Sequence, residues 1–156
     1  MKGFFFMEKA IEVALENVIS NQGGPFGAIV VKDGKIIDIG KNVVTASNDP
    51  TAHAEVQAIR AACQYLNDFQ LFDCEIYTSC EPCPMCIGAI YWARPKAVYY
   101  ACTKEDAAKI GFDDQFIYDE IEKPLSARSI PMIPFMREEA LAGFRKWEEK
   151  PDKTEY

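Results

Sequence analysis

Two short fragments constrain the fold of this chain most, because their side chains suggest one shared site. Residues 51–55 read Thr-Ala-His-Ala-Glu, and residues 81–86 read Glu-Pro-Cys-Pro-Met-Cys. His53 is the only histidine in the chain, and Cys83 and Cys86 have the spacing of a metal knuckle. A fold that uses these residues together must bring two distant segments side by side.

The residue types indicate a catalytic zinc site. His53, Cys83 and Cys86 offer three ligands, one fewer than a closed structural site needs, and a three-ligand zinc with water in the fourth position is the catalytic arrangement. Glu55 is a carboxylate close to the histidine, suited to moving protons of that water. The pattern H-x-E followed by P-C-x-x-C is typical of zinc-dependent nucleobase deaminases. We therefore predict one Zn²⁺ per chain, with Glu55 as the catalytic residue.

Hydrophobic periodicity predicts a single layered α/β domain over residues 1–156 with a mixed sheet. Asp33-Gly34 between two apolar runs predicts a β-hairpin. The predicted strands are residues 26–32, 35–39, 74–79 and 98–101, and the predicted helical segments are residues 4–20, 49–65, 104–122, 137–149 and one that begins at the cysteine motif.

Both fragments are predicted to lie at helix N-termini. Asp49-Pro50 resembles an N-cap followed by proline at the first helical position, which places His53 in the first turn. Pro84 is predicted to open the second helix, so that Cys83 and Cys86 lie near unpaired N–H groups and the positive end of the helix dipole. This location favours thiolates, the form that binds zinc.

His53 and Glu55 are two residues apart on a helix and point in different directions, which argues against both binding one ion. The histidine is predicted to hold the metal, while Glu55 takes a proton from zinc-bound water. Hydroxide then attacks an amino-bearing ring carbon, and Glu55 passes the proton to the ring nitrogen and later assists the departing ammonia.

Composition limits the partners and the compartment. The net charge is −7, from 17 basic and 24 acidic residues, which disfavours a nucleic-acid partner. No apolar run approaches the roughly twenty residues of a membrane span, and the greasy start at residues 1–7 is too short for a secretory signal. Six cysteines without a signal segment fit a reducing cytoplasm better than a disulfide framework.

Other interpretations of the cysteines and the histidine stay open. A lone histidine near a helix start is often structural, and a C-x-x-C pair alone fits a redox centre as well as a metal clamp. Cys80 is a further thiol that competes for zinc or ends a strand. Cys63, Cys74 and Cys102 lie in apolar patterns and are predicted to be core residues.

The two motifs resemble those of the cytidine deaminase superfamily, and within it the chain is similar to the bacterial guanine deaminases. The likeness includes residues 23–28, 88–95 and 111–114 and the carboxyl-terminal Tyr156, and so covers most of the chain. The resemblance implies a three-layer α/β/α fold with a five-stranded sheet, a homodimer, and hydrolysis of guanine to xanthine and ammonia in purine catabolism. It also implies exchange of residues from about 130 to 156 between subunits.

The resemblance further implies a set of base-contacting residues. Polar contacts fall to Asn42, Asp114 and Tyr156, and apolar walls to Phe26 and Trp92. Guanine carries N1–H beside the reacting C2, so an acceptor such as Asp114 suits it, and aromatic faces suit a flat base. Alternatively, Phe26 and Trp92 are core residues and Asp114 is a solvated turn carboxylate.

Three other functions remain to be separated from guanine deamination. A transfer-RNA adenosine deaminase shares both zinc motifs, although the acidic charge disfavours it. A deaminase of cytosine, isocytosine, ammeline or a nucleoside is also compatible with the motifs. A non-catalytic zinc protein or thiol-redox protein is the alternative from another class.

Overall fold

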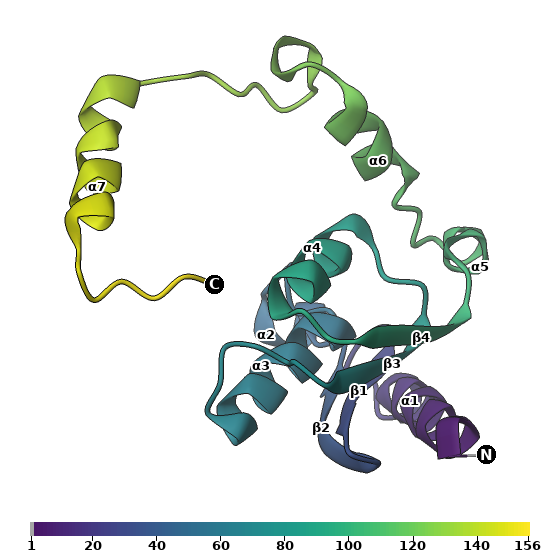
Figure 1. The fold of residues 1–156 in the computed structure, drawn as a ribbon. Coiled ribbons are helices and arrows are strands. Elements are labelled where there is room, and N and C mark those ends of the chain that lie inside the picture. The colour runs from purple at the N-terminus through teal and green to yellow at the C-terminus, as the bar shows by residue number, and fades with distance from the viewer. Residues whose placement is uncertain (1) are drawn as a thin grey trace. The chain divides into compact units, whose positions relative to one another are not determined.

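The computed structural model describes residues 2–156 and divides into two units, one ending at Asp114 and the other spanning Gln115–Tyr156. A mixed sheet of four strands organises the first unit, in the order β2-β1-β3-β4 (Figure 1). Its strands are β1 (Gly27–Lys32), β2 (Lys35–Lys41), β3 (Cys74–Cys80) and β4 (Ala97–Cys102). Strand β1 pairs antiparallel with β2 and β3, whereas β3 and β4 are parallel.

The turn between β1 and β2 forms where the sequence predicts it. Asp33 and Gly34 both have positive φ, 51° and 73°, and Lys32 pairs with Lys35 across them. Two consecutive positive φ angles define the turn that matches strand twist in a two-residue hairpin, and Asp-Gly adopts them readily. The hairpin prediction is confirmed.

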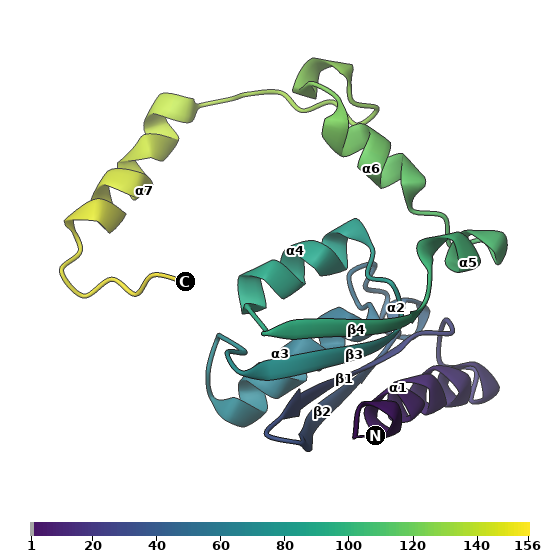
Figure 2. The same ribbon diagram turned by 45° about the vertical axis from the view of Figure 1, so that its right-hand side comes forward.

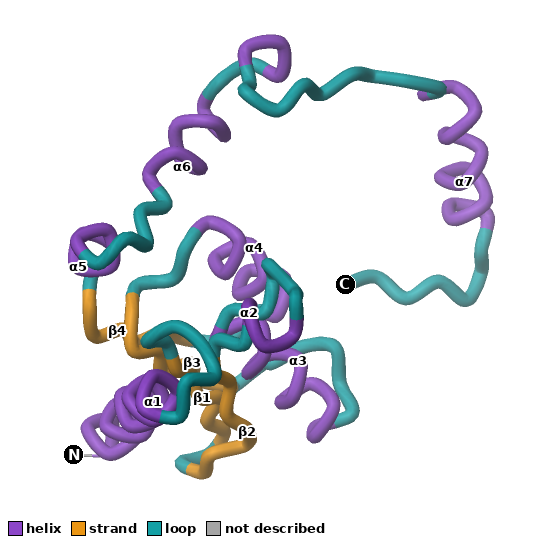
Figure 3. Tube along the Cα trace, turned by 180° about the vertical axis from the view of Figure 1, so that it is seen from behind, coloured by secondary structure: helices purple, strands orange, loops and turns teal. Residues whose placement is uncertain are grey.

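Helices cover both faces of the sheet, which confirms the three-layer prediction (Figures 2 and 3). Helix α1 (Lys2–Ile19) packs Phe6 and Ala10 on the face that carries Ile29, Val31 and Tyr77. Helices α3 (Ala54–Leu66) and α4 (Pro84–Ala93) pack on the opposite face. There the core consists of alternate strand residues with small and apolar helix residues: Ala28, Val30, Ile76, Ala54, Ala58, Ala62, Ile90 and Ala93.

A glycine in β2 allows α3 to approach the sheet closely. A Cβ atom on Gly40 would lie 2.1 Å from the carbonyl oxygen of Ala54 and 2.4 Å from the amide nitrogen of Ala58. Real Cβ atoms do not come this close to backbone, so any side chain here would push α3 away. Because His53 and Glu55 lie at the start of α3, Gly40 helps to set their depth.

The prediction of a fifth strand is wrong for the residues that the structure describes. After β4 the chain forms α5 (Lys104–Lys109), α6 (Gln115–Glu122), a short 3₁₀ turn (Leu125–Ala127) and α7 (Arg137–Glu149). Pro124, Pro131 and Pro134 interrupt the remaining stretch, and proline has no N–H to give to a strand ladder. Strand β4 is therefore an edge of the described sheet, while the predicted carboxyl-terminal helix is confirmed.

The edge position of β4 also corrects one core prediction. Cys74 is fully buried and Cys63 is half-buried beside the core, but Cys102 at the end of β4 is exposed. An apolar strand pattern predicts burial only if another layer covers both of its faces. In the first unit no described element covers this end of β4.

The start of α3 differs from the prediction as well. Asp49 accepts bonds from the amide and the hydroxyl of Thr51, at 2.8 and 2.6 Å, and so forms a local turn instead of capping a helix. A short helix, α2 (Val44–Ser47), lies within the predicted loop. Helix α3 begins at Ala54, so His53 is its N-cap residue and not part of its first turn.

No helix within residues 2–156 is long and apolar enough to span a bilayer.

Candidate metal centre

Two helix N-termini meet at the candidate metal centre. His53 precedes α3 with φ −73° and ψ 156°, and Cys83 precedes α4 with φ −69° and ψ 169°. Pro84 occupies the first turn of α4, as the sequence predicts. Neither residue makes a side-chain capping hydrogen bond to its own helix, and the His53 imidazole lies against the thiols of Cys83 and Cys86.

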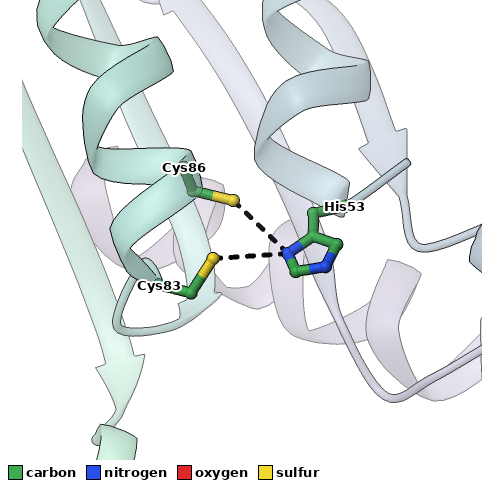
Figure 4. Close-up of side chains that lie close together, drawn as sticks. All are labelled: His53, Cys83 and Cys86. Atoms are coloured by element: carbon green, nitrogen blue, oxygen red, sulfur yellow. Dashed lines mark hydrogen bonds between the residues drawn. The ribbon is translucent and has the colours of Figure 1, made fainter. Parts of the chain in front are cut away.

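His53, Cys83 and Cys86 converge on one point (Figure 4). The Nδ1 atom of His53 lies 3.5 Å from the Sγ atom of Cys83 and 3.5 Å from that of Cys86. All three donor atoms lie within 4.8 Å of one another, and no other such group occurs among the described residues.

This arrangement fits zinc. Tetrahedral zinc, with bonds of about 2.3 Å to sulfur and 2.0–2.1 Å to nitrogen, requires a nitrogen-to-sulfur separation of about 3.6 Å. The observed separations of 3.5 Å agree with that requirement. Three ligands leave one position for water, and chemically the set is the mixed nitrogen and sulfur set that zinc favours.

Neighbouring groups shift the pKa values of all three candidate ligands. Hydrogen bonds from Cys86 and His53 lower the pKa of the Cys83 thiol. The bond to Cys83, together with burial, raises the pKa of Cys86, and the bond with Cys83 raises that of His53. Cysteine binds a cation as the thiolate, so metal binding would release the thiol protons.

Glu55 adjoins this centre through a contact with Cys86. It is buried, with 6% of its surface exposed, and its carboxylate accepts bonds from the Thr78 hydroxyl at 3.1 Å and from the Cys86 thiol at 3.4 Å. Burial raises the pKa of Glu55. A carboxyl group with a raised pKa takes up and releases protons closer to neutral pH, as a proton carrier needs.

Cys80 does not join the donor set. Burial raises its pKa to about 12, and its thiol donates to the carbonyl oxygen of Thr103 at 3.6 Å. The strand-end interpretation of Cys80 agrees with this contact. Glu81, the next residue, links the cysteine loop to α5 by accepting the Lys104 amide at 2.9 Å.

Two of the predicted base contacts lie on segments that hydrogen-bond to each other. The amide of Asn42 donates to the carbonyl oxygen of Phe26 at 3.3 Å. Asn42 is buried, with 7% of its surface exposed, and Phe26 is half-buried against the core. The Phe26 ring meets Phe112 edge-on, with ring centroids 4.9 Å apart.

The other three predicted base contacts have different surroundings. Asp114 is half-buried, and burial, together with the nearby charge of Cys83, raises its pKa. Trp92 lies on α4 with 61% of its surface exposed, so it is not a core residue of the first unit. Tyr156 belongs to the second unit and is 69% exposed.

Sequence reasoning missed three residues that support the site. Thr78 holds Glu55, Phe112 packs on Phe26, and Asn17 donates to the backbone carbonyls of Gly24 and Asn42. Thr78 and Asn17 give a signal in retrospect, since each is a polar residue at a position whose neighbours predict burial. Nothing local indicates which partner either one has.

Three comparisons relate the chain to known proteins. A family model described as the cytidine and deoxycytidylate deaminase zinc-binding region matches residues 3–102. The guanine deaminase of Bacillus subtilis is 58% identical over 151 residues, 97% of each chain. An X-ray structure of guanine deaminase from that organism superimposes with a TM-score of 0.97 and 57% identity, covering 100% of this chain and 99% of that one.

A transfer-RNA-specific adenosine deaminase is a more distant relative. The protein from Aquifex aeolicus is 36% identical over 117 residues, 74% of this chain and 74% of its own length. The matched family region, residues 3–102, includes the ligand triad and the buried Glu55. The chain belongs to the cytidine and deoxycytidylate deaminase family of zinc-binding proteins.

Proposed function

We propose that this protein is a zinc-dependent deaminase that hydrolyses guanine to xanthine and ammonia. The observation that carries the choice of base is the 58% identity to a guanine deaminase over 97% of both chains. The zinc-binding region ends at residue 102, whereas the match to the guanine deaminase structure covers 100% of this chain and so includes the segment with Asp114 and Tyr156.

In the proposed mechanism His53, Cys83 and Cys86 hold the zinc. When bound, zinc supplies a nucleophile at neutral pH by lowering the pKa of water to about 7. Glu55 takes up one proton of the water on its carboxylate and delivers it to the ring nitrogen beside the reacting carbon. It then takes up the second water proton, once the oxygen is attached to that carbon, and delivers it to the amine, which leaves as ammonia. Thr78 keeps the Glu55 carboxylate in place through the 3.1 Å bond, and burial keeps bulk water from competing for its proton.

The proposed base pocket combines Asn42 and Asp114 with the rings of Phe26 and Trp92. Tyr156 adds a further polar contact, which the exchanged carboxyl-terminal segment brings to the pocket of the other subunit. Asp114 suits the N1–H group of guanine, since a carboxylate only accepts hydrogen bonds when ionised. The Asn42 side chain offers both a donor and an acceptor. The half-buried Phe26 ring and the exposed Trp92 ring supply flat apolar faces.

A homodimer that exchanges residues from about 130 to 156 is part of the proposal. No side chain from Gln115 to Tyr156 is buried within the chain. Large apolar residues in this unit are strongly exposed, among them Ile130 at 78%, Ile133 at 80%, Phe135 at 84% and Phe144 at 72%. Exposed apolar surface of this extent marks an interaction site, and a second copy of the chain is the partner that the resemblance implies.

Deletion of residues 152–156 should lower kcat/KM for guanine by at least about tenfold while one zinc per chain remains, because the deletion removes a contact to the base but no ligand. Steady-state kinetics and metal analysis check this outcome. Lys153→Gln is the matched control, since it changes the same segment without removing Tyr156. Full activity after the deletion would contradict a role for the tail.

The alternative substrate with a specific observation behind it is transfer RNA, because a transfer-RNA adenosine deaminase shares 36% identity over 117 residues. The net charge of −7 opposes it, since such a substrate needs a basic footprint. We expect turnover of free guanine that changes little with salt, whereas affinity for RNA falls by about 10³–10⁵ between about 50 and 200 mM salt. Turnover of transfer RNA with none of guanine would reverse the assignment.

The proposal includes a cytoplasmic location. All six cysteines are free, and three of them lie within residues 80–86. Free cysteines persist in a reducing compartment, which supports the cytoplasm.

A further inference from the structure

Asn17 is a fully buried polar residue that the zinc chemistry does not use. It lies in the last turns of α1 with 1% of its surface exposed. Its Nδ2 atom donates to the carbonyl oxygen of Asn42 at 2.7 Å and to that of Gly24 at 2.8 Å. One carboxamide nitrogen thus uses both of its hydrogens on two separate loops.

These two loops carry two of the proposed base contacts, Phe26 and Asn42. Gly24 leads directly into Phe26, whose amide also donates to the Gly24 carbonyl oxygen at 2.8 Å. The Asn42 amide donates in turn to the Phe26 carbonyl oxygen at 3.3 Å. Asn17 therefore holds, through the backbone, both the aromatic wall and the polar residue that we assign to the base.

The packing around Asn17 leaves little freedom. A Cβ atom on Gly23 would lie 2.1 Å from the Asn42 carbonyl oxygen and 3.1 Å from Nδ2 of Asn17. The loop can run this close to Asn42 only because residue 23 is glycine. Small shifts of either loop would therefore be transmitted to the other.

The cost of keeping asparagine here argues that its hydrogen bonds matter. The Oδ1 atom of Asn17 is buried and has no hydrogen-bond partner in the structure. An unpaired buried acceptor lowers the free energy of unfolding, a penalty that an apolar side chain of similar size would avoid. The two bonds from Nδ2 are what asparagine provides and an apolar side chain does not.

We propose that Asn17 is a positioning residue that sets the separation of Asn42 and Phe26 and thereby tunes recognition of the purine. This inference rests on the proposed function. The Asn17 side chain bonds to the backbone of Gly24 and Asn42, and not to a metal ligand or Glu55, so its influence should fall on binding of the base and not on the proton transfer.

The test compares Asn17→Ala with Phe6→Leu. Phe6 lies on α1, the helix that also carries Asn17, and is buried against the sheet face opposite α3 and α4. Phe6→Leu therefore weakens the packing of α1 without changing the two loops. For Asn17→Ala we expect KM for guanine to rise about tenfold, with kcat within about threefold of the wild type and zinc retained. Phe6→Leu should lower Tm and leave KM unchanged.

Equal KM and kcat in Asn17→Ala and the wild type, with only Tm lowered, would overturn the proposal. If Asn17→Ala does not fold, Asn17→Ser carries the same test, because its single hydroxyl hydrogen cannot serve both carbonyl oxygens. Failure of the proposed function is a separate outcome, visible as a wild type that does not turn over guanine.

In that event hydrogen exchange decides the role of Asn17 without any substrate. The Asn42 amide should exchange at least about tenfold faster in Asn17→Ala than in Phe6→Leu. It donates to the carbonyl oxygen of Phe26, and without the Asn17 side chain the two loops that carry this hydrogen bond are no longer tied together. Equal exchange in both variants would overturn the positioning role.

Discussion

Replacement of Glu55 by glutamine should lower kcat for guanine by about 10²–10⁴ while one zinc per chain remains bound, because general acid–base catalysis contributes about that factor. Glutamine has nearly the same shape and can still accept the Thr78 hydroxyl, which lies 3.1 Å from the carboxylate. It cannot carry a proton between water and the base. Steady-state kinetics and metal analysis on the same sample measure both effects.

Glu8→Gln is the matched control for this substitution. Glu8 is an exposed carboxylate on α1, and its loss changes the net charge of the chain by the same amount. It should leave kcat and zinc content unchanged. Wild-type turnover in Glu55→Gln would contradict the proton-carrier role and would favour the alternative of a non-catalytic zinc or thiol-redox protein.

Cys83→Ser should remove zinc and reduce guanine turnover by at least about 10³, because the site then keeps two of its three ligands and cannot supply the activated water. The variant should also have a lower Tm than the wild type, since a ligand that binds only the folded state stabilises that state. Metal analysis, thermal unfolding and kinetics together check the three parts of this result.

Cys102→Ser serves as the control, because Cys102 is exposed on β4 and lies outside the donor group. It should retain zinc and activity. Full zinc content in Cys83→Ser would show that another thiol completes the site and would contradict the assigned ligand set. Cys80 would then be the nearest candidate in the sequence, although burial raises its pKa to about 12 and disfavours the thiolate.

The sequence predicts that both fragments lie at helix N-termini, because helix capping depends on residues that are adjacent in the chain. Pro84 directly after Cys83 has the fixed φ of a first helical residue, and the structure begins α4 there. The same rule failed at Asp49-Pro50, where the Asp49 carboxylate bonds to Thr51 instead. A residue that can cap a helix can also form a turn, and local sequence does not decide between the two.

The remaining differences concern long-range packing. Cys102 was predicted to be buried from the apolar pattern of its strand, yet the described sheet ends at β4. Likewise, the contact of Thr78 with Glu55 and the contacts of Asn17 with two loops join residues far apart in the chain. Periodicity indicates which face of an element is buried but not which polar groups meet there.

The most direct measurement of the central claim is the product analysis of a reaction with free guanine. Zinc-loaded protein should convert guanine into xanthine and ammonia in equal amounts, and Glu55→Gln at the same zinc content should form neither at a comparable rate. Cytosine, isocytosine, ammeline, nucleosides and transfer RNA, assayed in parallel, should release ammonia more slowly. Ammonia released from one of these substrates but not from guanine would contradict the account.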